Sequence, residues 1–392
     1  MSRVVLLKLI AFCVGVVTAL TGVAAQAAPA QPAAMHAILR QGIERAFNLD
    51  FAGAGVLFQR AVEMDPDDPT GYAFLAVNQL FTAEMDYDPV RRQASQEAAL
   101  RFAAEALARG DRRVAKNPRD GRAWFAMALA RMAKFRWALR NKQYVTTAEE
   151  AYSLWSYLEI AQSIEPDNYD SYLLTGLVRY HVDRLPDLVR FFSSLLIAKG
   201  DSRQGLADME LAAAKGSLLK ELAQSELISS YLNFEKQPAR ALPIARDLQR
   251  RYPRNYNVSF ALANVYSELH QFREALAIAR ELERGIASGR PPFVPQLKSR
   301  HDQLMGRICF NQGDYARAQG FFLQSVKDPS EANARVRAWS LVRLGMIHDA
   351  RKEREKAVER YRQALEVEGA EGIAKVEARK YLTDPYLPAQ GP

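Results

Sequence analysis

The stretch that decides the fold is AWSLVRLGMIHDARKEREKAVERYRQALEVEG, residues 338–369. Within it Gly345 is followed by Ala357, Tyr361 and Ala364, at spacings of 12, 4 and 3 residues. The last three positions recur on one face of a helix, and a glycine lets a second helix approach closely because it has no side chain. The spacing therefore predicts two antiparallel helices that pack against each other at Gly345.

The same spacing, which we call the repeat frame, recurs in four other segments of the chain. Two of these segments end at Pro66 and Pro253, where proline cannot continue a helix. Repetition at this period is the sequence signature of stacked helical hairpins, an all-α solenoid. The first positions of the four other frames are Gly42, Ser229, Ala263 and Gly306.

Two further segments carry the frame with an insertion. Gly176 and Gly205 are 29 residues apart, and Ala128 and Leu154 are 26 apart, where the regular frame has 12. The insertions are therefore 17 and 14 residues long. We expect the second insertion to lengthen both helices of its hairpin. In all, we expect about eight helical pairs, with residues 373–382 as a capping helix.

The pattern resembles the tetratricopeptide repeat, which has a Leu-Gly pair and a Tyr in its first helix and an Ala and an aromatic residue in its second. Leu344 and Gly345 match the pair, His348 stands where the Tyr would be, and Tyr266 keeps that Tyr in an earlier unit. The resemblance implies a right-handed α-solenoid that binds proteins or peptides. A weaker local resemblance, over residues 199–216 and 228–253, is to the tetratricopeptide repeat protein 39/Iml2 group, and no function is carried over from it.

The N-terminus has the layout of a secretory signal. Arg3 and Lys8 supply positive charge at the start of a long apolar run. Ala25 and Ala27 fit the small-residue pattern of a cleavage site. We expect an exported protein, periplasmic or secreted, with an uncleaved membrane anchor as the alternative. The expected parts are a signal peptide at 1–27, a flexible mature N-terminus at 28–34, irregular repeats with insertions at 35–216, regular repeats at 217–368, and a capping helix with a tail at 369–392.

Composition narrows the class of function. Of the 392 residues 48% are hydrophobic and 25% are charged, as in a folded protein. The net charge of +8 is scattered rather than gathered in a basic run, which argues against nucleic-acid binding.

No catalytic constellation emerges from the sequence. The five histidines share no metal-ligand spacing, and no nucleophile or phosphate-binding motif is present. Cys309 and His348 both stand at packing positions, where a buried structural role is expected. We therefore predict a non-enzyme without cofactor or metal.

In place of a catalytic site, a solenoid offers a concave groove, which is lined by the first helix of each hairpin. Extrapolation of the repeat frame predicts a groove surface of amides, guanidinium groups and one aromatic ring, which suits an extended peptide with acidic groups or a free C-terminal carboxylate. An ordinary solvated polar face is the alternative. The predicted groove residues are Asn257, Phe260, Asn264, Arg300, Gln303, Arg307 and Arg343.

The same face turns apolar toward the N-terminus. A large exposed apolar surface is unfavourable in a soluble protein, so we expect either a partner or the protein itself to cover it. The predicted stripe comprises Phe125, Leu129, Leu173, Leu177 and Tyr180.

Residues 187–198 form an apolar insertion that is too short to span a bilayer. Its large residues share one helical face, which predicts an extra helix that covers the groove or docks on a membrane or a partner. These residues are Leu188, Phe191, Phe192, Leu195 and Leu196. We thus predict a non-catalytic exported scaffold for protein or peptide partners in envelope assembly or secretion. The alternative is a membrane-associated assembly factor that docks through residues 187–198.

Overall fold

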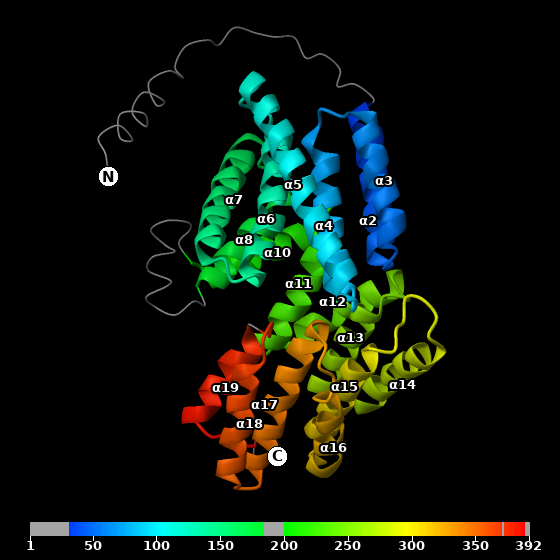
Figure 1. The fold of residues 1–392 in the computed structure, drawn as a ribbon, viewed down its shortest axis with the longest axis vertical. Coiled ribbons are helices and arrows are strands. Elements are labelled where there is room, and N and C mark those ends of the chain that lie inside the picture. Colours follow the sequence, from blue (N-terminus) through cyan, green and yellow to red (C-terminus); the bar gives the residue numbers. More distant parts are fainter. Residues whose placement is uncertain (1–30, 184–199, 371, 389–392) are drawn as a thin grey trace, which may run out of the picture. The chain divides into compact units, whose positions relative to one another are not determined.

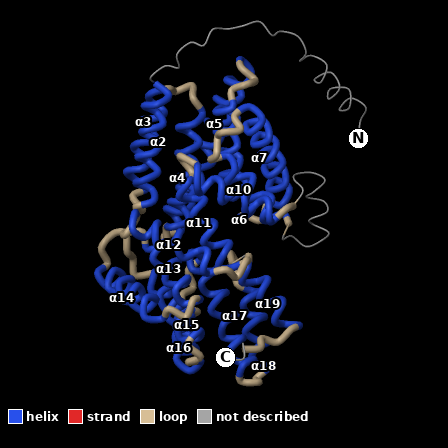
Figure 2. The backbone as a smooth tube through the Cα atoms, turned by 180° about the vertical axis from the view of Figure 1, so that it is seen from behind, coloured by secondary structure: helices blue, strands red, loops and turns tan. Residues whose placement is uncertain are grey.

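The computed structural model describes residues 31–183, 200–370 and 372–388. The predicted signal peptide and the predicted helix at 187–198 lie outside these residues. The chain divides into residues 1–36 and residues 37–392, and the second unit contains the helical array. In the described part, helices are joined only by loops and turns, and no strand is present (Figure 2). None of these helices is both long enough and apolar enough to cross a membrane.

Sixteen of the described α-helices pair in chain order into eight hairpins, and α19 (Ile373–Thr383) follows them (Figure 1). The expected number of pairs is thus confirmed, and a helix lies where the capping helix is predicted. The hairpins are α2 (Gln31–Phe47) with α3 (Phe51–Met64), α4 (Pro69–Met85) with α5 (Pro89–Lys116), α6 (Gly121–Arg140) with α7 (Tyr144–Ile164), α8 (Ser171–Val182) with α10 (Ser202–Lys215), α11 (Lys220–Asn233) with α12 (Pro238–Arg251), α13 (Tyr256–Glu268) with α14 (Phe272–Ser288), α15 (Leu297–Asn311) with α16 (Tyr315–Ser325), and α17 (Ala334–Ala350) with α18 (Arg354–Glu366). A short 3-10 helix, η1 (Glu331–Asn333), precedes α17.

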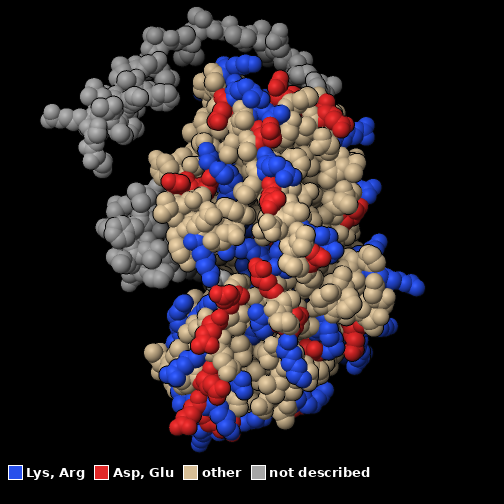
Figure 3. Space-filling model, viewed as in Figure 1, with Lys and Arg blue, Asp and Glu red and all other residues tan. Residues whose placement is uncertain are grey.

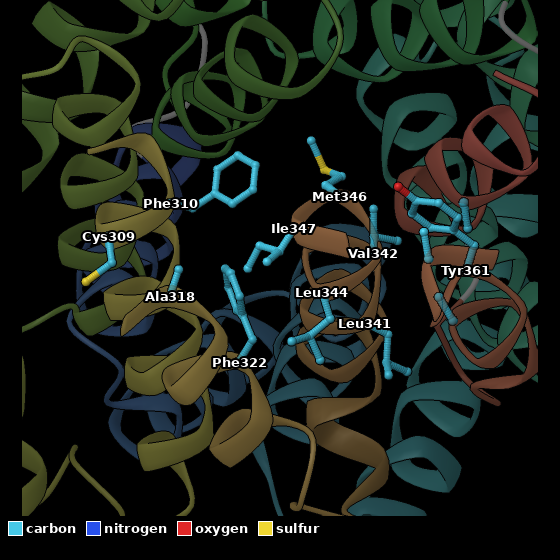
Figure 4. Close-up of a cluster of buried hydrophobic side chains, with 13 residues drawn as sticks. Cys309, Phe310, Ala318, Phe322, Leu341, Val342, Leu344, Met346, Ile347 and Tyr361 are labelled. Carbon is cyan, nitrogen blue, oxygen red and sulfur yellow. The ribbon is translucent and has the colours of Figure 1, made fainter. Parts of the chain in front are cut away.

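The glycines of the repeat frame are the points where the paired helices touch. A Cβ atom added to Gly345 would lie 2.4 Å from Cε1 of Tyr361, and one added to Gly306 would lie 2.6 Å from Cε1 of Phe322. Neither distance is possible for real carbon atoms, so each aromatic ring occupies the space that a side chain would need. Successive hairpins then share one core, in which Phe322 of α16 points toward Leu344 of α17 (Figure 4).

A common turn joins the two helices in six of the hairpins. One residue of each turn has left-handed backbone angles, with φ between 54° and 80°. In α17, the amide of Glu353 donates to the carbonyl of His348 at 2.8 Å, which closes the end of the first helix in the Schellman pattern. Glycine occupies the left-handed position only at Gly313, where the sequence predicts it. The other five positions are Leu49, Lys142, Lys236, His270 and Lys352.

The irregular hairpins follow the predicted insertions. α6 and α7 are 20 and 21 residues long, so the 14-residue insertion lengthens both helices as expected. In the next hairpin, a Cβ atom on Gly176 would lie 2.7 Å from the carbonyl oxygen of Gly205, so α8 and α10 pack backbone to backbone.

The predicted apolar stripe belongs to the core. Phe125, Leu129, Leu173 and Tyr180 are buried, and Leu177 is half-buried. α4 packs on α6 and α10 packs on α8, so helices of the array cover their own apolar faces. Cys309 and His348 are also buried, and His348 Nδ1 lies 2.6 Å from Glu353 Oε2.

Candidate functional site

The seven predicted groove residues lie on the first helices of three consecutive hairpins, α13, α15 and α17. Six of the side chains are half-buried. Phe260 is the exception, because it is only 1% exposed and cannot contact a ligand directly.

Phe260 instead supports Arg300. The guanidinium group of Arg300 lies over the Phe260 ring, 4.3 Å from its centroid, and donates a hydrogen bond to Oδ1 of Asn257 at 2.5 Å. Burial lowers the pKa of Arg300 below its ordinary value. Among the described residues, no carboxylate forms an ion pair with Arg300, so its charge lacks a direct counter-charge.

Arg307 and Arg343 lie near a half-buried carboxylate at the end of α13, that of Glu268. Arg307 Nε donates to Glu268 Oε1 at 2.9 Å, and Asn311 Nδ2 donates to the same oxygen at 3.0 Å. Although burial opposes ionisation, Arg307 and Arg343 lower the pKa of Glu268 to about 2. Arg343 itself lies over the Phe310 ring at 4.8 Å, and no hydrogen bond or ion pair joins it to a carboxylate within the described ranges.

Two amides complete the predicted surface. Gln303 is half-buried on α15, between the positions of Arg300 and Arg307. Asn264 lies on α13, and its Oδ1 is buried without a hydrogen-bond partner. An unpaired buried acceptor costs free energy that a donor from a ligand would recover.

The sequence analysis missed an acidic group on the same series of first helices. Glu226 lies on α11. Burial and the nearby Glu84 raise the pKa of its carboxyl, whereas Arg136 and Arg335 oppose this shift. Arg136 is already paired with Glu84 at 2.5 Å. Glu226 stands three residues before Ser229, just as the predicted groove residue Gln303 stands three residues before Gly306. The repeat frame could therefore have predicted Glu226 as a residue of the same surface.

A cavity of about 320 Å³ lies beside this acidic group. Its walls come from first helices, namely α2, α4, α11 and α13, together with the turn after α2 and parts of α3 and α12. Most of the lining is apolar. Asn257 lines the cavity and also accepts the hydrogen bond from Arg300.

Charges of both signs surround these features. On the face shown in Figure 3, Lys and Arg are interspersed with Asp and Glu, and no large patch of one sign stands out. Among the described residues, no three His, Cys, Asp or Glu side chains form a group that could hold a metal ion. The arrangement offers recognition by charge, hydrogen bonding and shape.

Eight stacked helical hairpins define an α-solenoid. The family model of the tetratricopeptide repeat matches residues 340–374, which comprise most of α17 and all of α18. The comparison thus identifies one tetratricopeptide repeat unit, at residues 340–374.

Solved structures with similarity to the chain include two tetratricopeptide repeat proteins and yeast Tom70. A tetratricopeptide repeat protein of Thermus thermophilus is 21% identical over 59% of this chain and 98% of its own, with a TM-score of 0.37. One from Parabacteroides merdae is 14% identical over 75% and 93%, with a TM-score of 0.31. Yeast Tom70 is 11% identical over 90% and 82%, with a TM-score of 0.38. No curated protein matches the chain.

Proposed function

We propose that the protein is a non-catalytic scaffold that binds an acidic peptide segment of a partner protein along α13, α15 and α17. The observation that carries the proposal is the pair Arg300 and Arg343. Each guanidinium is half-buried over an aromatic ring. Among the described residues Arg300 forms no ion pair with a carboxylate, and the carboxylate near Arg343, Glu268, is hydrogen-bonded to Arg307 instead. A buried charge without a counter-charge costs free energy, and a carboxylate of the partner would offset that cost.

The amides on the same helices suit an extended backbone. Asn264 offers an acceptor and Gln303 offers both a donor and an acceptor. A peptide that lies across the three helices would thus meet guanidinium groups for its acidic side chains or its C-terminal carboxylate. The amides would pair with its peptide groups.

The composition of residues 1–27 supports an exported location for this scaffold, periplasmic or secreted. An interaction scaffold in that location would act in envelope assembly or secretion. Residues 187–198, which the membrane-docking alternative needs, lie outside the described structure.

A display library of random decapeptides with free C-termini tests the proposal. Sequences retained by the wild-type protein should be enriched in Asp, Glu or an accessible terminal carboxylate. The double variant Arg300→Gln and Arg343→Gln should bind those peptides at least about tenfold more weakly. Arg362→Gln, which changes an exposed arginine on α18, is the matched control and should bind like the wild type. Equal binding by the double variant would overturn the proposal.

A further inference from the structure

The cavity beside Glu226 has a chemistry of its own. Its volume of about 320 Å³ falls at the lower end of the range for small-ligand pockets, and it is large enough for a large apolar side chain. Five phenylalanines contribute to its walls, so a ligand inside it would exchange water for aromatic surface. These are Phe47, Phe51, Phe58, Phe74 and Phe81.

Most polar groups of the lining are already paired. Asn255 donates to the carbonyl of Phe47 at 2.8 Å, and Asn257 accepts from Arg300. Ser225 Oγ donates to a backbone carbonyl at 2.9 Å. None of these groups is left to select a ligand.

Two acceptors remain. Asn78 is 4% exposed, and its Nδ2 donates to the carbonyl of Phe51 at 3.0 Å, while its Oδ1 has no partner. Glu226 has no hydrogen bond or ion pair within the described part of the chain. Both groups are acceptors, so a complementary ligand must bring donors, and the carboxylate favours a cation.

The local charge points in the same direction. Arg136 and Arg335 both lie near Glu226, but Arg136 is paired with Glu84 and neither guanidinium forms an ion pair with Glu226 among the described residues. Burial raises the pKa of Glu226, and an incoming ammonium or guanidinium group would stabilise its ionised form.

Asn257 lies next to both the cavity and the proposed groove, because it lines the cavity and accepts a hydrogen bond from Arg300. We infer that the cavity is a specificity subsite for a peptide segment in which a large apolar side chain stands next to a lysine or arginine. The apolar side chain fills the cavity, and the basic group pairs with Glu226. The acidic part of the same peptide reaches Arg300. This inference rests on the proposed function.

Fluorescein-labelled peptides of four kinds test the inference by anisotropy. Each has an acidic C-terminal half that a Gly-Ser spacer joins to a Leu-Lys, Leu-Glu, Gly-Lys or Gly-Gly pair, and each kind is made with several spacer lengths. With the wild-type protein, the Leu-Lys peptide should bind at least about tenfold more tightly than the Gly-Gly peptide at the best spacer length. Glu226→Gln should abolish the preference for Lys over Glu, and Ala261→Phe, which fills the cavity, should abolish the preference for Leu over Gly.

The matched controls are Glu281→Gln and Ala287→Phe, both at exposed positions on α14, and neither should change any preference. Circular dichroism melting of each variant confirms that it is folded. If all four peptides bind equally and lose affinity in the Arg300 and Arg343 double variant, the subsite is overturned while the proposed function stands. If none of them binds, both are overturned.

Discussion

Arg300 of α15 lies over the ring of Phe260 of α13, with 4.3 Å between the guanidinium carbon and the ring centroid. One hairpin thus positions the charged group of the next. We predict that Phe260→Leu weakens binding of an acidic peptide about two- to fivefold, because Arg300 loses a cation–π contact worth about 0.5–1 kcal/mol.

Anisotropy titration with a peptide from the library selection measures this effect. Phe322→Leu is the control, since it replaces a buried phenylalanine that packs on Gly306. Phe322→Leu should lower the melting temperature and leave the affinity unchanged. An unchanged affinity in Phe260→Leu would show that Arg300 does not need the ring.

Gly345 is predicted to tolerate no side chain. Gly345→Ala should destabilise the fold by about 1–3 kcal/mol, because its Cβ would lie 2.4 Å from the Tyr361 ring and force the helices apart. Gly320→Ala is a matched control, since Gly320 is exposed in a helix and a Cβ added there would have no atom within 4 Å. It should stabilise by up to about 1 kcal/mol. Urea unfolding followed by circular dichroism shows whether the free energy of unfolding falls in Gly345→Ala and rises in Gly320→Ala.

At a left-handed turn, substitution by glycine is predicted to stabilise the protein, whereas the same substitution within a helix destabilises it. Lys352 has φ of 61°, which costs a non-glycine residue about 1 kcal/mol, so Lys352→Gly should raise stability by a few tenths to about 1 kcal/mol. Gly313→Ala, at the equivalent turn with φ of 80°, should lower it by about 1 kcal/mol. Lys356→Gly, within α18, should also destabilise. Thermal melting compares the three variants, and a loss of stability in Lys352→Gly would contradict the assignment of strain.

Glu268 should make the protein acid-sensitive. Its pKa is lowered from 4.5 to about 2 in the folded state, so its contribution is present above the unfolded pKa and is lost as the pH falls toward 2. Glu268→Gln should therefore cost about 2 kcal/mol near pH 7 and flatten the decline of stability in acid. Urea midpoints at a series of pH values test this, with Glu281→Gln as the exposed control. Parallel pH profiles of Glu268→Gln and the wild type would refute the prediction.

The packing of each hairpin could be read from the chain. Gly42, Gly306 and Gly345 each accept an aromatic ring from the following helix, and all three stand at the predicted position. The contact is visible in sequence because both partners are less than twenty residues apart and repeat at one spacing. The same frame also contained Glu226, although the groove was extrapolated only over α13, α15 and α17.

Left-handed turns without glycine could not be read in this way. Lys142, His270 and Lys352 adopt positive φ because the two helices on either side dictate the turn, whereas the residue itself disfavours it. Phe260 was likewise predicted to face the groove, yet Arg300 covers it.

By itself, the sequence determined the class of fold, the number of hairpins and the closest helix contacts, because these depend on local spacing and on the volume of single side chains. The tertiary structure alone decided which charges lack partners and where a cavity lies. Arg300 and Glu226 owe their state to helices far away in sequence, and the burial and counter-charges that govern ionisation exist only once those helices have packed.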